Sequence, residues 1–132
     1  MKLLASAFAT LCFSAMVDAD QGISRPDPKP SPDVLEATPQ LYNYTTELLF
    51  GEVWKREELA PRDRSLITVA ALIAQGQAAQ LPFHLNRAMD NGLTRTQAAE
   101  VVTHLAFYVG WPKAMSAVPV LKDVFDARDK QV

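Results

Sequence analysis

The sequence predicts an all-α fold, a compact bundle of about five to six helices. Three observations support this prediction. Nowhere does the chain show the apolar and polar alternation of a half-buried strand. Apolar residues instead recur three and four positions apart, in stretches separated by glycine and proline. The length of 132 residues, 48% of them hydrophobic and 21% charged, is typical of one globular domain with a single core.

The N-terminus has the composition of a secretory signal. Lys2 precedes an uncharged, mostly apolar run, and Val17-Asp18-Ala19 is a plausible cleavage site. The run is shorter than the roughly 20 residues that a membrane span needs. We therefore interpret residues 1–19 as a signal peptide and expect an exported protein, periplasmic or secreted, without stable membrane insertion.

Two features of composition exclude whole classes of function. Cys12 is the single cysteine, so a chain without residues 1–19 has no disulfide and no thiol-based redox or metal site. The net charge is −2, with acidic and basic residues interspersed. Such a chain lacks the basic field that nucleic-acid binding uses, so nucleic acid is not an expected partner.

Residues 20–37 are interpreted as a proline-rich linker. Four prolines fall within residues 24–33, which disfavours helix and sheet hydrogen bonding and predicts an extended segment. The folded domain is expected to occupy residues 38–132. Its first helix should begin with Thr38 as the N-cap and Pro39 at the first helical position. This helix carries apolar residues towards Phe50 and ends at Gly51: Leu41, Tyr44, Leu48 and Leu49.

A loop over residues 54–60 leads to the most apolar segment, residues 61–75, which Pro61 opens and Gly76 ends. We interpret this segment as a buried central helix. Its β-branched residues are also compatible with a buried strand, but its length and alanines favour helix.

Three further helices follow. The first covers residues 82–91 and stops at Gly92. Thr94 and Gln97 form a capping-box pattern that opens a helix through Val109, whose apolar face holds Ala98, Val101, Val102, Leu105, Ala106 and Val109. The last helix starts near Pro112 and should be kinked or split by Pro119. It carries the apolar residues Met115, Val118, Leu121, Val124 and Phe125.

Two histidines are the candidates for acid–base chemistry. His84 lies in an apolar helical stretch, where a histidine is more often a satisfied core residue than a catalytic one. His104 is followed one turn later by Tyr108 and preceded one turn earlier by Glu100, which forms a polar row able to handle a proton. The same row is also compatible with an ordinary solvated face.

Spacing along the sequence also indicates which cationic side chains can bind a substrate and whether the histidines can share a metal. Arg64 opens the most apolar helix and Arg87 lies one turn after His84, so either guanidinium can anchor a substrate carboxylate. A metal shared by the two histidines is disfavoured because no carboxylate has ligand spacing to His84 and HExxH is absent. We expect neither a metal site nor a cofactor.

Several short motifs together resemble one known family. They are Gly51-x-x-Trp54, Arg64-Ser65-Leu66, Asn91-Gly92-Leu93-Thr94 and His104-x-x-x-Tyr108-x-Gly110-x-Pro112. Over residues 50–125 the chain is similar to the carboxymuconolactone decarboxylase family, which includes the alkylhydroperoxidase D-like proteins. The resemblance implies an all-α fold that assembles into a homo-trimer or homo-hexamer, with the site at a subunit contact near His84.

The resemblance also separates two chemistries. In the hydroperoxidase branch a Cys-x-x-Cys-x-x-x-His motif acts, but Gln77 and Gln80 stand at the cysteine positions here. A glutamine amide cannot form a thiolate, so hydroperoxide reduction is the least expected activity. The decarboxylase branch keeps the histidine without the cysteines, and its members often carry an acidic residue at the position of Gln80.

The decarboxylase branch implies cofactor-free decarboxylation or proton transfer on a small carboxylated lactone or related acid. His84 would act as the acid/base, and His104 or Tyr108 would donate to the enolate oxygen. Arg64 or Arg87, with Gln80 and Trp54, would bind the substrate. The alternative is an oligomeric protein that binds a small molecule or partner without catalysis.

Overall fold

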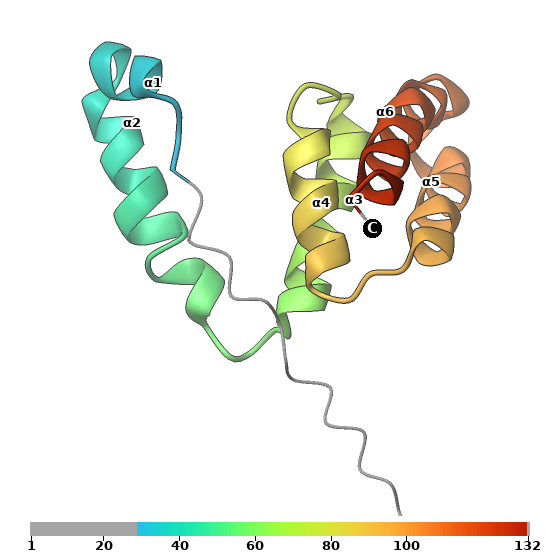
Figure 1. Ribbon diagram of the computed structural model, residues 1–132, viewed down its shortest axis with the longest axis horizontal. Helices are drawn as coiled ribbons and strands as arrows, with labels where there is room; N and C mark the ends of the chain where they lie inside the picture. The colour runs from blue at the N-terminus through green and yellow to red at the C-terminus, as the bar shows by residue number, and fades with distance from the viewer. Residues whose placement is uncertain (1–28, 132) are drawn as a thin grey trace, which may run out of the picture.

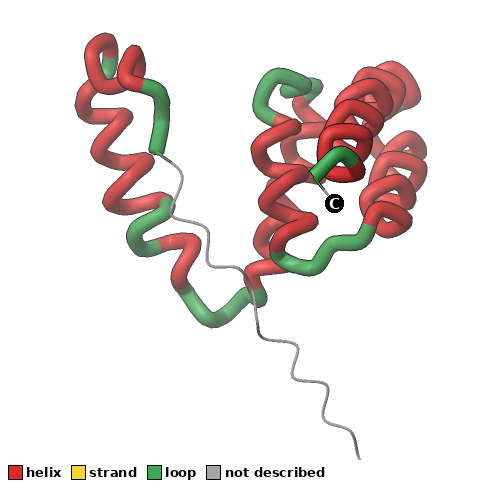
Figure 2. Tube along the Cα trace, viewed as in Figure 1, coloured by secondary structure: helices red, strands yellow, loops and turns green. Residues whose placement is uncertain are grey.

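The computed structural model describes residues 29–131, so the predicted signal peptide and most of the predicted linker lie outside the described residues. Within this range all regular structure is helical (Figure 2). The α-helices are α1 (Pro32–Ala37), α2 (Pro39–Asn43), α3 (Pro61–Gln75), α4 (Leu81–Asp90), α5 (Arg95–Val109) and α6 (Trp111–Asp129). A π-helix, η1 (Tyr44–Leu49), and a 3-10 helix, η2 (Val53–Lys55), complete the set. The all-α prediction is confirmed for the described chain.

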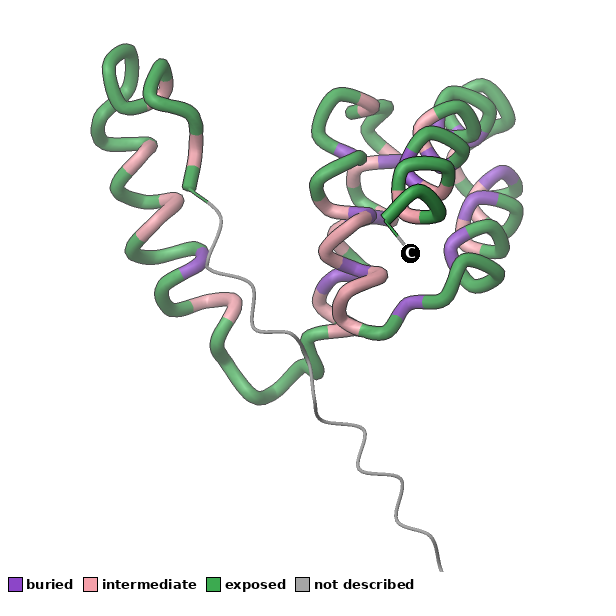
Figure 3. Tube along the Cα trace, in the orientation of Figure 1, coloured by how far each residue is buried: buried purple, intermediate pink, exposed green. Residues whose placement is uncertain are grey.

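The helices form two parts. Helices α3 to α6 pack into a bundle in which α3 contacts α4, α5 and α6. Helices α1, α2 and η1, which we call the arm, stand beside this bundle (Figure 1). None of the three arm helices contains a buried residue, and Figure 3 shows the buried positions gathered in the bundle. Phe50, directly after the arm, is buried.

The core of the bundle comes from one face of each helix. Val69 and Ile73 of α3 meet Leu81, Leu85 and Ala88 of α4, with contributions from α5 and α6. Among the described residues Ser65 is the one buried polar side chain. Its hydroxyl accepts a hydrogen bond from Asn91 Nδ2 at 2.8 Å, so the buried oxygen is satisfied.

The ends of the bundle helices follow the predicted signals. Gly76 ends α3 in the left-handed conformation, with φ of 71°, which glycine adopts without the steric cost of a side chain. The capping box is confirmed, because the backbone N–H of Gln97 donates to Thr94 Oγ1 at 3.1 Å. The backbone N–H of Thr94 donates in turn to Gln97 Oε1 at 3.0 Å. The strand alternative for residues 61–75 is wrong, since these residues form α3.

The arm differs from its prediction in two respects. Helix α1 starts at Pro32, inside the segment expected to be extended through residue 37, because proline is well tolerated at the first helical position. Pro39 does begin α2, but the Thr38 side chain does not cap it. The Thr38 hydroxyl instead donates to the carbonyl of Val34 at 3.0 Å.

Burial in α3 and α6 also departs from expectation. Helix α3 is not buried all round, since Ile67 is 54% exposed. Helix α6 runs through Pro119 as one element, and it buries Ala114, Ala117, Leu121 and Val124. Met115 and Val118, two of the apolar residues that this helix carries, are both exposed. Small alanines let α6 approach the bundle closely, which turns the larger apolar side chains outward.

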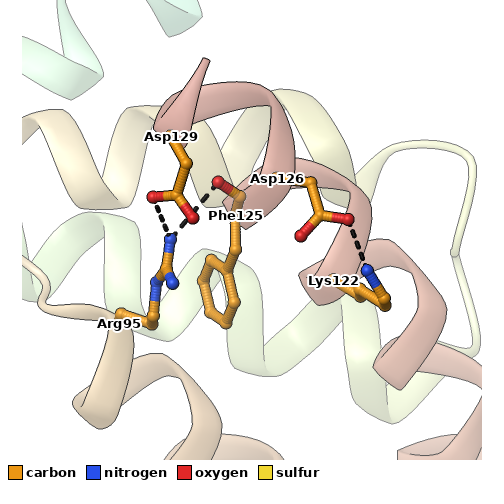
Figure 4. A network of polar contacts seen from close by, with 5 residues as sticks. All are labelled: Arg95, Lys122, Phe125, Asp126 and Asp129. Carbon is orange, nitrogen blue, oxygen red and sulfur yellow. Dashed lines mark hydrogen bonds and ion pairs between the residues drawn. The ribbon is translucent and has the colours of Figure 1, made fainter. Parts of the chain in front are cut away.

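Polar contacts hold α6 to the rest of the bundle. Arg128 Nη1 donates to Asp90 Oδ1 at 3.0 Å and to Asn86 Oδ1 at 3.1 Å, which joins α6 to α4. Arg95 of α5 pairs with Asp129 at 2.5 Å and stacks over Phe125 (Figure 4). Within residues 29–131 no helix combines the length and apolar character that a bilayer crossing requires.

Candidate functional site

A histidine, an arginine and a tryptophan meet where the arm joins the bundle. Trp54 lies on η2, and its ring stacks on that of His84 of α4, with centroids 6.2 Å apart and planes at 28°. Phe83 packs edge-on against His84 at 4.8 Å. The imidazole is therefore half-buried between two aromatic side chains.

Arg87 covers the same aromatic surface. Its guanidinium carbon lies 4.5 Å from the centroid of the Trp54 ring and 5.2 Å from that of Phe50. Phe50 in turn contacts Trp54, with centroids 5.8 Å apart, and Phe83, with centroids 6.4 Å apart. We call these five residues the His84 site: Phe50, Trp54, Phe83, His84 and Arg87.

The local sequence explains this arrangement. Residues three apart on a helix lie on one face, so His84 and Arg87 both project from α4 on the side away from its buried Leu85. The chain must also turn sharply between Phe50 and Trp54. Gly51 permits this turn, because a Cβ atom there would lie 2.2 Å from the carbonyl oxygen of Glu47.

The electrostatics of the site favour a neutral imidazole. Burial lowers the pKa of His84 below its usual value, and the positive charge of Arg87 lowers it further. The buried Nδ1 atom of His84 has no hydrogen-bond partner. A neutral imidazole has one N–H donor and one acceptor nitrogen, so His84 has hydrogen-bonding capacity that the chain itself does not use.

Two other predicted binding residues, Arg64 and Gln80, make different contacts. Arg64 is half-buried on α3, and its Nη2 atom donates to the carbonyl of Arg56 at 3.0 Å. Its Nε atom is buried without a hydrogen-bond partner. Gln80 is the N-cap residue of α4 and is exposed, but its side chain does not cap the helix. Among the described residues no hydrogen bond or ring contact joins either side chain to His84, so their roles stay predictions.

His104 and Tyr108 belong to another surface. Both are exposed on α5, with ring centroids 4.7 Å apart. His104 lines an open cavity of about 390 Å³ together with Arg62, Glu100 and apolar side chains of α3 and α5. Among the described residues no ion pair joins Glu100 to His104, and no ring contact joins either histidine to the other. A single chain thus does not unite the two candidate groups.

Within residues 29–131 no three histidine, cysteine, aspartate or glutamate side chains gather as a possible ligand set.

Sequence reasoning did not identify Phe50 as a site residue. The available signal was its position at the end of an amphipathic segment, directly before the Gly51-x-x-Trp54 motif.

The fold and the site define a class of small all-α proteins with a half-buried histidine stacked on an aromatic ring that also carries an arginine. The sequence profile described as "Carboxymuconolactone decarboxylase family" matches residues 39–123. This range includes the His84 site, α3 to α5 and most of α6. The chain belongs to the carboxymuconolactone decarboxylase family.

Three curated proteins show related sequences. A 4-carboxymuconolactone decarboxylase of Acinetobacter baylyi is 35% identical over 83 residues, which cover 63% of this chain and 62% of the relative. A nitrosuccinic acid decarboxylase of Metarhizium robertsii is 37% identical over 86 residues, covering 64% and 60%. An uncharacterized 15.0 kDa protein of Paracoccus denitrificans is 29% identical over 87 residues, covering 64% and 65%. The chain thus spans less than two thirds of the length of each relative.

Proposed function

We propose that the protein is a carboxy-lyase that removes carbon dioxide from a small dicarboxylic acid at the His84 site. The observation that carries this proposal is the stack of His84 and Arg87 on Trp54, with the pKa of His84 lowered. The two named relatives are both decarboxylases, which supports the same reaction type for this chain.

The two acids in the relatives' names suggest the class of substrate. Each carries a carboxylate whose loss leaves an electron pair beside an electron-withdrawing group, a conjugated lactone carbonyl in one and a nitro group in the other. Each also retains a second carboxylate after the reaction. We therefore propose a substrate with an electron acceptor next to the departing carboxylate and a second carboxylate that serves as a handle.

Arg87 is suited to hold the retained carboxylate. A guanidinium can form two parallel hydrogen bonds to a carboxylate while its face stays on an aromatic ring. The stack on Trp54 and Phe50 limits the orientations available to the Arg87 head group. A substrate carboxylate bound at Arg87 would therefore sit within one helical turn of the imidazole.

His84 would transfer the proton that the reaction requires. Loss of carbon dioxide breaks the carbon–carboxylate bond and leaves the bonding electrons on the substrate, as an enolate or nitronate. One proton must then be added at carbon. We assign this transfer to neutral His84, whose N–H donates the proton to carbon while its second nitrogen takes up a proton derived from solvent. The imidazole therefore stays neutral but ends as the opposite tautomer, and proton exchange with solvent restores the starting tautomer before the next turnover.

The proposal is tested by carbon dioxide release and substrate loss with two probes, 4-carboxymuconolactone and nitrosuccinate. The His84→Ala substitution should lower turnover roughly 100-fold or more, which is the scale of general acid–base contributions. Helical circular dichroism should be retained, because His84 is outside the buried core cluster.

Two outcomes would contradict the assignment. Full activity in the His84→Ala variant would remove this histidine from the chemistry. Saturable binding of either acid by the unaltered protein, with no turnover under any pH tested, would instead indicate a binding protein that has lost the reaction.

A further inference from the structure

The segment that carries Trp54 has little burial of its own. Residues 51–64 are each exposed or half-buried, and residues 55–60 are all exposed. The helix η2 is a single 3-10 turn, whose hydrogen-bond geometry is poorer than that of an α-helix. Segments with few buried contacts open locally at a low free energy. The position of Trp54 therefore depends on a small number of specific contacts.

The contacts within the His84 site hold the ring of Trp54. The ring stacks on His84 with centroids 6.2 Å apart, meets Phe50 at 5.8 Å and lies under the guanidinium of Arg87 at 4.5 Å. The main chain after η2 continues as an exposed loop to Pro61. Contacts of the ring alone do not fix the path of that loop, so the main chain after Trp54 needs a contact of its own.

Arg64 makes such a contact. Its Nη2 atom donates to the carbonyl oxygen of Arg56 at 3.0 Å, and Arg56 directly follows η2, two residues after Trp54. The Nε atom of Arg64 is buried, so packing holds the base of the guanidinium while its tip reaches the loop. Hydrogen bonds from a charged donor are stronger than neutral ones, which suits a contact that joins an exposed loop to a helix.

The start of α3, from which Arg64 projects, is itself fixed to α4. Asn91, the residue that ends α4, donates through Nδ2 to the buried hydroxyl of Ser65 at 2.8 Å and to the carbonyl of Pro61 at 3.4 Å. Helix α4 also carries His84. Contacts therefore run from α4 to α3, through Arg64 to the loop after Trp54, and from the Trp54 ring back to α4.

A direct role of Arg64 in binding a substrate carboxylate is less well supported. The causes that lower the pKa of His84 are burial and the charge of Arg87. A two-pronged contact with a carboxylate uses two N–H groups of one guanidinium. In Arg64 the Nε atom is buried and Nη2 is bonded to the loop, so two of the groups that such a contact can use are enclosed or occupied.

We propose that Arg64 is a positioning residue of the His84 site, which ties the loop after η2 to α3 and thereby holds the Trp54 ring against His84 and Arg87. The two arginines then have separate tasks, since Arg87 binds the substrate and Arg64 maintains the stack. The effect of Arg64 on turnover rests on the function proposed above, whereas its effect on the position of Trp54 does not.

The fluorescence of Trp54 tests this role without any substrate. The chain has two tryptophans, so a Trp111→Phe background leaves Trp54 as the single emitter. An imidazolium in contact with an indole quenches its emission, so the signal should fall as pH drops below about 6.5 and His84 gains a proton. In Arg64→Met this step should be largely lost. Its kcat/KM for a dicarboxylic substrate should fall roughly tenfold, because small misplacements of positioning groups are costly.

Matched variants separate this effect from general damage to α3. Arg62 lies on the same turn and pairs with Asp63 at 2.8 Å, so Arg62→Met should keep both the step and the activity. His84→Gln should abolish the step, which identifies its source. Circular dichroism should show that Arg64→Met keeps its helices, since water can reach the Arg56 carbonyl in the exposed loop. If Arg64→Met does not fold, Arg64→Gln replaces it, because its shorter neutral side chain keeps part of the packing.

Several outcomes would overturn the proposal. One is a full fluorescence step in the folded Arg64 variant, including the case in which KM rises and Arg64 is therefore a substrate anchor. Another is an equal loss of the step in Arg62→Met, and a third is a parent protein that shows no step. Loss of the step in Arg64→Met of a protein that releases no carbon dioxide would support the role of Arg64 and contradict the carboxy-lyase assignment alone.

Discussion

Two arginines in the described part of the chain stack on aromatic rings, and their surroundings differ. Arg87 lies 4.5 Å over Trp54 beside His84, while Arg95 lies 4.8 Å over Phe125 and pairs with Asp129. The carboxylate of Asp129 raises the pKa of Arg95, whereas Arg87 acts on its neighbour by lowering the pKa of His84.

The contrast shows that the stack itself does not identify a functional site. A cation over a ring is a common packing contact, and in the Arg95 network it joins α5 to α6 (Figure 4). At Arg87 the same contact sits next to a half-buried titratable group with an unused buried nitrogen. That neighbour is what makes the Arg87 stack a candidate for chemistry.

The largest expected difference between the two stacks is in turnover. Arg87→Gln should lower kcat/KM for a dicarboxylic substrate by roughly 10- to 100-fold, because a charge-assisted hydrogen bond is worth about 1.5–3 kcal/mol. Arg95→Gln is the matched control and should leave kcat/KM unchanged. Steady-state carbon dioxide release measures both. Equal losses in the two variants would mean that the effect is structural.

The next difference concerns the titration of His84. Arg87→Gln removes the smaller of the two causes that lower its pKa, so the pKa should rise while burial still holds it below the ordinary value near 6.5. Arg95→Gln should not change it. The chain has two histidines, and NMR titration with a His84→Gln variant assigns their signals. An unchanged pKa of His84 in the Arg87→Gln variant would show that the charge of Arg87 does not act on His84.

The lowered pKa of His84 also determines the direction in which the free energy of unfolding changes with pH. A folded-state pKa below the unfolded value means that the unfolded chain binds more protons in the window between them. The contribution of His84 to the free energy of unfolding should therefore fall as pH drops from about 6.5 through the lower folded pKa. Urea unfolding of the unaltered protein and His84→Gln measures this, and the variant should lose that component of the pH dependence.

The smallest expected effect is on stability at the Arg95 network. Asp129→Asn removes an exposed ion pair, so it should lower Tm only slightly, and less in high salt, which screens exposed charges. Asp90→Asn weakens the less exposed pair with Arg128 between α4 and α6 and should lower Tm further. Calorimetry at two salt concentrations checks the order of the two variants.

The sequence predicted the bundle better than the arm because helix ends depend on local chemistry. Gly76 and the pair Thr94 and Gln97 act within a few residues of themselves, and the structure confirms these ends. Which face of α6 is buried is not local. Apolar residues surround much of that helix, so periodicity alone did not exclude Met115 and Val118 from the core, and packing of the alanines decided it.

The same distinction between local and non-local determinants applies to the candidate site. Proximity of His84 and Arg87 followed from their spacing on one helix. The contacts of these residues with Trp54 and Phe50 could not be predicted from spacing, because they depend on the turn at Gly51 and on how the arm joins the bundle. Spacing likewise placed His104 beside Tyr108 but could not reveal that this pair faces another surface.

Pro119 has a consequence for the chemistry of any molecule that covers the exposed apolar surface of α6 formed by Trp111, Met115 and Val118. Proline has no amide hydrogen, so the carbonyl oxygen of Met115, four residues earlier, lacks its usual helical donor. Met115 is exposed in the middle of that surface, where water can supply the missing hydrogen bond. A purely hydrocarbon occupant would strip this oxygen of water and leave it unsatisfied. A stable occupant must therefore bring a hydrogen-bond donor of its own.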